Sequence, residues 1–204
     1  MSAPVAASKR EATKAANRAA ILAAASEVFA DLGYEAASIR DVIRRTELAA
    51  GTFYNYFPDK ESVFRALVSE RVRPLRARLR EARAGASSLE EFVRRGYRAY
   101  FGFIASDPDL FSLLRRNAGT IRSVMDAPVL DAGVEELLED LRGATARGDL
   151  PPGVDADYLA GAMTGVGLEV AVRMVERRPM DVDGATAFAT GLFLGGIARL
   201  GGGG

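Results

Sequence analysis

Hydrogen-bonding side chains gather between positions 51 and 60 of this chain. Four of them carry a hydroxyl or an amide: Thr52, Tyr54, Asn55 and Tyr56. Phe53 and Phe57 lie four positions apart, so on a helix they share one face that can enter a core. The polar tips are left on the other faces, and Lys60 adds a positive charge just beyond them. Such a helix suits contact with a polar surface, and the groove of DNA is the leading candidate.

Two residue types are absent, and their absence excludes most catalytic and metal-binding arrangements. The 204 residues contain no Cys and no His. Without Cys there is no disulfide framework and no thiolate metal site. Without His the chain lacks the commonest general base and the nucleophile–histidine pairs of many hydrolases. We therefore expect no catalytic residue, no metal and no cofactor. An enzyme stays as a rival class that turnover assays would decide.

The charged residues are unevenly distributed, although the formal net charge is zero. Residues 1–83 hold 15 basic and 10 acidic residues, whereas residues 84–204 hold 12 basic and 17 acidic ones. A basic first part favours binding to phosphate, and an acidic second part disfavours wrong contacts with the same polyanion. Ordinary fluctuation remains the alternative explanation of this asymmetry.

The chain carries no pattern typical of secretion or of a membrane span. Its first residues lack the charged and then apolar layout of a signal peptide. The longest apolar stretch, Tyr158 to Val175, is interrupted by Glu169 and Arg173. We expect a cytoplasmic protein with no membrane contact.

Helix signals surround the segment at 51–57. Apolar residues at helical spacing predict a helix over about 12–32 that ends at Gly33. Ser38 and Asp41 form a capping-box pattern that starts a second, short helix. The connection Glu47-Leu48-Ala49 leads into a third helix that contains residues 51–57. Two short helices joined by three residues predict a helix-turn-helix.

Residues from about 12 to 65 resemble the DNA-binding domain of the TetR family of bacterial transcriptional repressors. Three sequence segments carry the resemblance: Ser38-Ile39-Arg40-Asp41-Val42-Ile43, Gly51-Thr52-Phe53-Tyr54-Asn55-Tyr56-Phe57 and Asp59-Lys60-Glu61. Their order and spacing match the family pattern, over roughly a quarter of the chain.

The resemblance implies DNA contacts at nine positions. It implies base-edge or groove contacts for Arg40, Ala50, Gly51, Thr52 and Asn55. It implies phosphate contacts for Ser38, Tyr54, Tyr56 and Lys60. These roles are chemically sensible, because Arg can read guanine, Asn can read adenine, and hydroxyls and Lys can hold phosphates.

Three residues depart from the family pattern. The family usually has a small residue where Ile43 stands, because the two helices approach closely there. Glu47 stands where the family usually has Gly, and a positive φ there would cost a non-Gly residue of order 1 kcal/mol. Ala49 stands where Ser or Thr usually caps the recognition helix, which forgoes roughly 1 kcal/mol. We therefore expect a recognition helix that becomes fully ordered only on DNA.

The pattern of the rest of the chain also predicts helices. We expect an all-α protein of about nine helices, with a helix-turn-helix domain at 1–60, including a disordered arm at 1–10, and a regulatory and dimerisation domain at 61–204. Pro74 should kink or restart the basic fourth helix. Gly85-Ala86-Ser87-Ser88 is the clearest linker.

The resemblance places a ligand cavity in the second part of the chain. The candidate lining residues are apolar or aromatic: Tyr97, Tyr100, Phe103, Phe111, Leu114, Met163 and Val166. Packing in an ordinary core is the alternative reading of these residues. Arg115, Arg116 and Arg122 could bind an acidic group, although such residues are usually solvated.

The resemblance implies that the last two predicted helices form a dimer interface, and the glycine spacing is compatible with that. Gly161 with Gly165, and Gly191 with Gly195, stand four positions apart and predict close approach of a neighbouring helix. Glu169 and Arg173 are spaced as an i,i+4 ion pair, either solvated or meeting a ligand or a dimer seam.

The family resemblance implies a homodimeric, ligand-responsive repressor. It implies double-stranded operator DNA of near-palindromic sequence and a small apolar or aromatic effector as partners. A transcriptional activator and a ligand-independent DNA-binding protein remain the alternatives.

Overall fold

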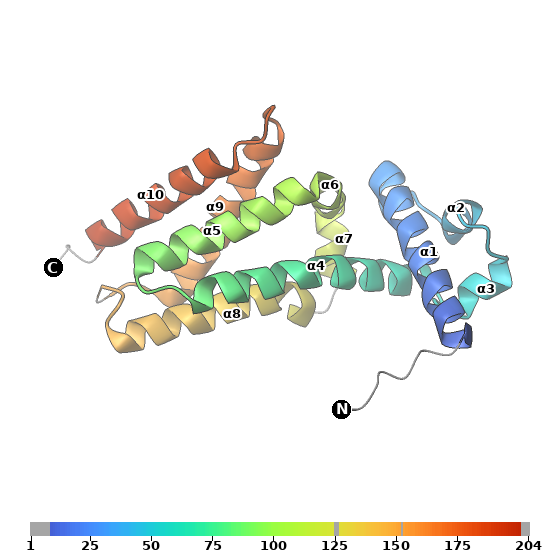
Figure 1. Cartoon of the computed structure of the whole chain (residues 1–204), viewed down its shortest axis with the longest axis horizontal. Helices are drawn as coiled ribbons and strands as arrows, with labels where there is room; N and C mark the ends of the chain where they lie inside the picture. Colours follow the sequence, from blue (N-terminus) through green and yellow to red (C-terminus); the bar gives the residue numbers. More distant parts are fainter. Residues whose placement is uncertain (1–8, 125–126, 152, 201–204) are drawn as a thin grey trace. The chain divides into compact units, whose positions relative to one another are not determined.

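The computed structural model describes residues 9–124, 127–151 and 153–200, and no strand occurs among them (Figure 1). Ten helices cover these residues: α1 Lys9–Leu32, α2 Ile39–Arg44, α3 Ala50–Tyr54, α4 Lys60–Ala84, α5 Leu89–Ser106, α6 Pro108–Arg116, α7 Ala118–Val124, α8 Ala127–Arg147, α9 Ala156–Val175 and α10 Val182–Leu200. The predicted all-α class is confirmed.

One helix more than expected arises at Asn117, which separates α6 from α7. Its side-chain Nδ2 donates to the Leu113 carbonyl at 2.8 Å. A side chain that bonds the local backbone in this way competes with the helical ladder.

The predicted arm at 1–10 overlaps the first helix. Residues 1–8 lie outside the described part, whereas Lys9 and Arg10 already belong to α1.

Contacts divide the chain into two compact units. The first contains the described residues within Met1–Arg71 and Ser112–Met125, and the second those within Val72–Phe111 and Asp126–Gly204. Helices α4 and α6 therefore each contribute to both units. The domain boundary predicted from the sequence, between residues 60 and 61, places nearly all of α4 in the second domain, whereas the first unit extends to Arg71.

The first unit is built on the apolar face of α1. Its side chains Ile21, Val28 and Phe29 are fully buried. The Phe29 ring meets the Phe64 ring of α4 edge-on, with centroids 5.1 Å apart. Gly33, at φ +79°, ends α1 as predicted, because this left-handed conformation suits glycine.

Helix α4 runs without interruption from Lys60 to Ala84. Asp59 caps its start by accepting a hydrogen bond from the Ser62 N–H at 2.7 Å, as expected for this position. Of the predicted kink or restart at Pro74, the restart does not occur. Pro74 is exposed and stays inside the helix, so the loss of its backbone donor does not end the helix.

The second unit packs α5, α8, α9 and α10 around one core. Helix α10 lies along α5 and contacts α9, which in turn contacts α8 (Figure 1). The core combines buried residues of all four helices, among them Phe101, Leu141, Met163, Ala171 and Phe193.

Helix α9 is long and apolar enough to cross a membrane by length and composition, with a mean hydropathy of 1.2. Six of its residues, including Met163 and Met174, are buried in the protein. A core helix passes the same composition test, so this is weak evidence for a span.

Candidate nucleic-acid interface and ligand cavity

Helix α2 begins with the predicted capping box. The Ser38 hydroxyl accepts a hydrogen bond from the Asp41 N–H at 3.3 Å, and the Ser38 N–H donates to Asp41 Oδ2 at 3.0 Å. The hydrogen bonds from the Ser38 side chain and backbone hold the pKa of Asp41 below its ordinary value. The carboxylate is therefore kept charged at the positive end of the helix, which fixes where α2 starts.

The turn between α2 and α3 avoids the strain predicted for it. No described non-glycine residue has a positive φ, so Glu47 does not adopt the left-handed conformation. The predicted strain at Glu47 is wrong, because the turn takes another path. Ala49 does precede α3 without a side-chain cap, as expected.

Two phenylalanines anchor α3. Phe53 is 1% exposed and Phe57 5% exposed, which confirms that this pair enters a core. Their ring centroids lie 6.2 Å apart, and the Arg18 guanidinium lies 5.5 Å from the centre of the Phe57 ring. The regular helix is short: Asn55 is its C-cap, and Tyr56 lies in the following turn.

Most of the predicted DNA-contact residues are accessible. The exposed ones are Ser38, Arg40, Ala50, Gly51, Tyr54 and Asn55. The half-buried ones are Thr52, Tyr56 and Lys60. Eight of the nine lie on α2, on α3 or at their immediate borders, and Lys60 is the first residue of α4.

Arg40, near the start of α2, differs from Arg44 and Arg45 at the end of this helix. Arg45 donates to Asp31 Oδ2 at 2.7 Å, and Arg44 lies 3.8 Å from Asp41 Oδ1. Arg40 forms no ion pair with any residue in the described ranges. Its guanidinium can therefore bind a partner without first breaking an internal contact.

Lys60 has an internal role that its sequence position did not reveal. Its ammonium group donates to the carbonyl oxygens of Tyr34 at 2.8 Å, Ala37 at 3.0 Å and Glu35 at 3.5 Å. The same group lies 4.3 Å from the centre of the Tyr34 ring. Lys60 thus ties the start of α4 to the loop that leads into α2.

A second residue that binds this loop, Asn117 between α6 and α7, was not among the sequence-predicted sites. Its Oδ1 accepts from the Tyr34 N–H at 2.7 Å, and its Nδ2 donates to Phe29 O at 3.4 Å as well as to Leu113 O. The side chain is buried, with each of these groups paired. An Asn at a helix end reads as an ordinary terminus, so no sequence signal could have identified this contact.

A cavity of about 260 Å³ lies within the second unit. Its lining is mainly apolar and comes from α4, α5, α8 and α9: Val72, Leu75, Arg76, Leu79, Arg83, Phe92, Gly96, Tyr97, Tyr100, Gly133, Val134, Leu137, Met163, Thr164, Gly167 and Leu168. A mainly apolar cavity with a few polar groups is typical of a small-molecule site, although this one lies just below the usual size range.

The structure brings three predicted pocket residues together, namely Tyr97, Tyr100 and Met163. The other four do not line this cavity: Phe103, Phe111, Leu114 and Val166. Phe111 and Val166 pack in or against the core, and Phe103 lies under the Arg78 guanidinium at 5.4 Å. Leu114 belongs to the first unit.

The predicted acid-binding arginines also lie elsewhere. Arg115 and Arg116 belong to the first unit, where Arg116 donates to Ala30 O at 3.2 Å. The Arg122 side chain lies outside the described residues. The two arginines that do line the cavity are Arg76 and Arg83, both from α4.

The cavity tyrosines are neutral groups. Burial raises the pKa of Tyr100 to about 12 and that of Tyr97 further. The Tyr97 hydroxyl donates to the Met163 carbonyl at 3.0 Å. A Cβ added at Gly167 would be in ordinary van der Waals contact with both rings, 3.4 Å from Tyr97 and 3.5 Å from Tyr100.

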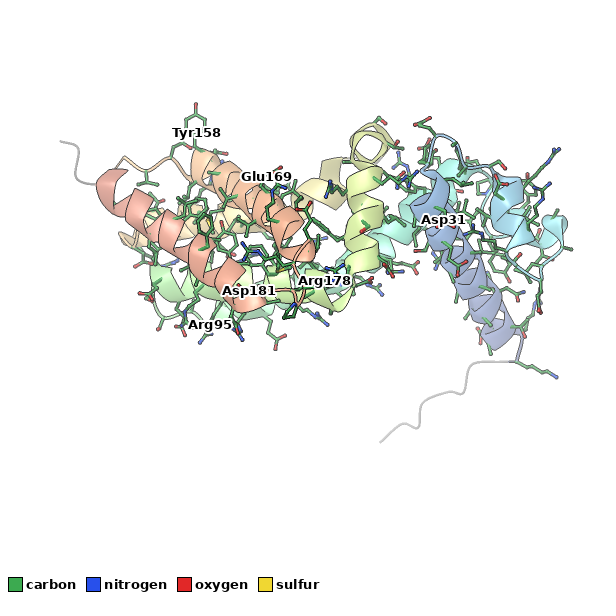
Figure 2. All side chains as sticks on the ribbon, turned by 90° about the horizontal axis from the view of Figure 1, so that it is seen from above. Asp31, Arg95, Tyr158, Glu169, Arg178 and Asp181 are labelled. Carbon is green, nitrogen blue, oxygen red and sulfur yellow. The ribbon has the colours of Figure 1, made fainter. Side chains whose placement is uncertain are left out.

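The outer surfaces of α9 and α10 expose large apolar side chains. Tyr158 is 82% exposed and Phe188 63%, and Leu168 and Leu192 are also exposed. Figure 2 shows Tyr158 pointing away from the helices. The glycines Gly161, Gly165, Gly191 and Gly195 lie exposed on the same two helices, and a Cβ at each would meet nothing within 4 Å. No neighbouring helix within the described chain therefore explains these glycines.

The predicted pair of Glu169 and Arg173 is not formed. Arg173 instead contacts Glu176 Oε2 at 3.2 Å. Glu169 is exposed on α9 (Figure 2). The described residues also contain no group of three or more acidic side chains that could hold a metal ion.

One family model and one curated relative match parts of the chain by sequence. Residues 21–67 match the family model described as bacterial regulatory proteins, tetR family. The HTH-type transcriptional activator FasR of Mycolicibacterium smegmatis is 30% identical over 100 residues. That alignment covers 49% of this chain and 46% of FasR, so the chain spans less than half of this relative.

Solved structures match most of the chain. The fatty acid degradation regulator FadR from Bacillus halodurans superposes with a TM-score of 0.75 at 25% identity, over 88% of this chain and 95% of FadR. FadR from Bacillus subtilis in complex with stearoyl-CoA gives 0.73 at 22% identity, over 85% and 95%. A tetR family protein from Rhodococcus RHA1 gives 0.73 at 23% identity, over 88% and 96%. The last two likenesses establish the fold.

Proposed function

Because this chain is a TetR family transcriptional regulator, we propose that it binds double-stranded DNA and that a small molecule in its second unit controls this binding. The observation that carries the first part is the accessible polar surface of α2 and α3, seated on two buried phenylalanines. A helix held from behind in this way can present its polar tips to a DNA groove.

In this proposal the contact residues divide into two groups. Arg40 and Asn55 read base edges, with Ala50, Gly51 and Thr52 allowing close approach or small contacts in the groove. Ser38, Tyr54 and Tyr56 hold phosphate oxygens and set the register, and Lys60 supports them from the start of α4. The unpaired state of Arg40 supports its place in the first group.

Two classes of variant test the DNA-binding proposal. Tyr54→Phe should weaken binding to all sequences by a similar factor, because a phosphate contact carries no base information. Arg40→Ala and Asn55→Ala should instead each relax the base preference at one operator position. Binding to a selected operator and to scrambled DNA is measured at several salt concentrations. Unchanged affinity and base preference in all three variants would end the assignment.

For the effector, we propose a molecule with a long hydrocarbon chain. The mainly apolar cavity between α4, α5, α8 and α9 supports an oily ligand. The Bacillus subtilis FadR structure is described as a complex with stearoyl-CoA, and the Bacillus halodurans FadR as a fatty acid degradation regulator. Such a ligand releases DNA only if it binds the DNA-free state more tightly than the DNA-bound one.

We further propose that two copies assemble through α9 and α10. The exposed Tyr158, Leu168, Phe188 and Leu192 form an unusually apolar outer surface, and the glycines permit close helix approach. A two-fold dimer would read a near-palindromic operator, with half-sites about one turn of DNA apart.

Repression by occlusion is the regulatory outcome that we favour, in the bacterial cytoplasm where DNA lies. The match to FasR supports an activator as the second candidate, because that protein is described as a transcriptional activator. In vitro transcription from a promoter carrying the operator separates the two. A repressor lowers transcript yield and the effector restores it, whereas an activator raises the yield.

A further inference from the structure

Two guanidinium groups interrupt the lining of the cavity. Arg76 and Arg83 line it on the α4 side, next to Val72, Leu75 and Leu79 of the same helix. The opposite walls supply apolar side chains, tyrosines and Thr164, but no acidic group. A purely hydrocarbon ligand would leave these two cations facing an apolar partner, which is unfavourable.

The acidic partners of these arginines do not balance them. Glu136 Oε1 accepts from Arg76 Nη2 and from Arg80 Nη2, each at 2.7 Å. Asp140 Oδ2 accepts from Arg83 Nε at 2.8 Å. Three guanidinium groups thus share two carboxylates of α8, which leaves one net positive charge in this cluster.

One hydrogen-bond donor of the cluster has no partner. Arg76 Nε is buried and donates to no atom of the described residues. Glu136 Oε2 is likewise buried without a hydrogen bond, and Arg83 Nη2 lies 4.0 Å from it. Because a buried unpaired polar group is costly, each needs an explanation.

Neither tyrosine can supply the missing negative charge. Burial raises the pKa of Tyr97 and of Tyr100, so both stay protonated at neutral pH. Burial also acts to raise the pKa of Glu136, but the hydrogen bonds from Arg80 and Arg76 outweigh it and leave that pKa lowered. Glu136 is therefore already a carboxylate, and none of these three groups supplies a further negative charge to the cluster.

We infer that the effector carries an anionic group and that Arg76 binds this group while the hydrocarbon chain fills the cavity. This inference rests on the proposed function, since it concerns the same cavity. The anion competes with Glu136 for the Arg76 guanidinium. The shared chemistry is an acid at the end of an apolar chain, either a free carboxylate or the phosphates of an acyl-CoA.

Three probes of equal chain length test the inference: dodecanoate, dodecanoyl-CoA and 1-dodecanol. Titration calorimetry of the full chain measures their affinities. We expect at least one of the two anions to bind about tenfold or more tightly than the alcohol, since hydrogen bonds to charged groups are the strong ones. Arg76→Gln should remove about 10- to 100-fold of that affinity and leave the alcohol unchanged.

Arg80→Gln is the matched control. Arg80 bonds the same Glu136 oxygen at the same distance, yet its side chain is 66% exposed, against 35% for Arg76, and does not line the cavity. The Arg80→Gln substitution removes the same charge as Arg76→Gln. It should change the affinity for the anions by no more than about twofold relative to the natural chain, because an exposed charge contributes little. Glu136→Gln removes the competing carboxylate and should tighten binding of the anion.

The anion whose binding weakens in Arg76→Gln shows whether the acidic group of the effector is a free carboxylate or the phosphates of an acyl-CoA. Equal binding of alcohol and anions, or equal losses in Arg76→Gln and Arg80→Gln, would overturn the inference while the proposed apolar effector still stands. If none of the three probes binds a chain that retains operator affinity, the effector proposal fails together with this inference. Operator binding, measured separately, distinguishes that result from a misfolded protein.

Discussion

The ammonium group of Lys60 organises the loop that leads into α2. It donates to the carbonyl oxygens of Tyr34, Glu35 and Ala37. Asn117 holds the Tyr34 N–H of the same loop. The position of the Ser38 cap, and hence of α2, therefore depends on two side chains from other parts of the first unit.

Lys60→Met should destabilise the chain even without DNA. The substitution leaves up to three carbonyl oxygens without their donor, at a cost of about 1–3 kcal/mol in the free energy of unfolding. Urea denaturation followed by circular dichroism measures this change. Operator affinity should also fall, because α2 loses its support.

Tyr54→Phe serves as the control for Lys60→Met. The Tyr54 side chain is exposed, so removing its hydroxyl should leave the free energy of unfolding unchanged. If Lys60→Met keeps full stability and only reduces the salt dependence of DNA binding, its ammonium serves phosphate and the loop contacts are incidental.

Helix α5 starts with an arrangement that is sensitive to acid. The Glu91 carboxylate accepts from the Ser87 N–H at 2.8 Å and from the Ser87 hydroxyl at 2.7 Å, and it also pairs with Arg95. Ser88 provides the cap itself by accepting from the Glu91 N–H. The hydrogen bonds from the Ser87 backbone and side chain, followed by Arg95, lower the pKa of Glu91 to about 2.

The Glu91 arrangement should contribute to stability only above acidic pH. Its folded-state pKa of about 2 lies below the ordinary value of 4.5, so the unfolded state binds more protons between these values. The contribution is therefore fully present above pH 4.5 and is lost as the pH falls toward 2. Urea midpoints measured from pH 6 to pH 3 should fall less steeply in Glu91→Gln than in the natural chain.

Glu90→Gln is the natural comparison for Glu91→Gln. It removes a neighbouring charge from the first turn of α5 without touching the Ser87 hydrogen bonds. Its pH dependence should follow that of the natural chain. Parallel curves for Glu91→Gln and Glu90→Gln would contradict the role assigned to Ser87.

Local patterns were enough to predict several elements. The Ser38–Asp41 capping box and the Phe53–Phe57 spacing involve neighbours along the chain, and both formed as expected. The missing cap at Ala49 was equally local. The predicted strain at Glu47 did not arise, because a turn of this length can take a path that a family pattern does not specify.

Contacts between distant segments were beyond prediction. Lys60 reaches residues more than 20 positions away, and Asn117 reaches residues 83 and 88 positions away. The sequence contains many basic side chains on α4, and only the arrangement of α4, α5, α8 and α9 around the cavity decides that Arg76 and Arg83 line it. Three of the seven predicted pocket residues line it, because apolar periodicity cannot separate a cavity wall from a packed core.

For the whole molecule, the exposed apolar side chains and glycines of α9 and α10 point to a second copy. Glycine in an exposed helix costs about 1 kcal/mol relative to alanine. Within the described chain nothing offsets that cost at Gly161, Gly165, Gly191 or Gly195. Close approach of a partner helix would do so.

Gly191→Leu should weaken self-association by about tenfold or more, because the new side chain would meet the partner helix. Sedimentation equilibrium measures the dissociation constant, and circular dichroism confirms that the helices remain. Operator affinity should fall in parallel, because a monomer reads only one half-site.

Gly119→Leu is the matched control, since Gly119 is also exposed and a Cβ there would also meet nothing within 4 Å. It should leave the dissociation constant unchanged. An unaltered dimer in Gly191→Leu, or equal weakening by both substitutions, would remove α9 and α10 from the proposed interface.

The continuity of α4 has a consequence for genetics. Lys60 opens this helix and belongs to the first unit, whereas Arg76 belongs to the second and lines the cavity. If the proposed function holds, alleles that abolish operator recognition and alleles that abolish the response to the effector can fall in one uninterrupted helix. A lesion mapped only to α4 does not reveal which phenotype it causes. The first unit ends at Arg71 within this helix. Whether the lesion lies before or after Arg71 therefore indicates which unit it affects.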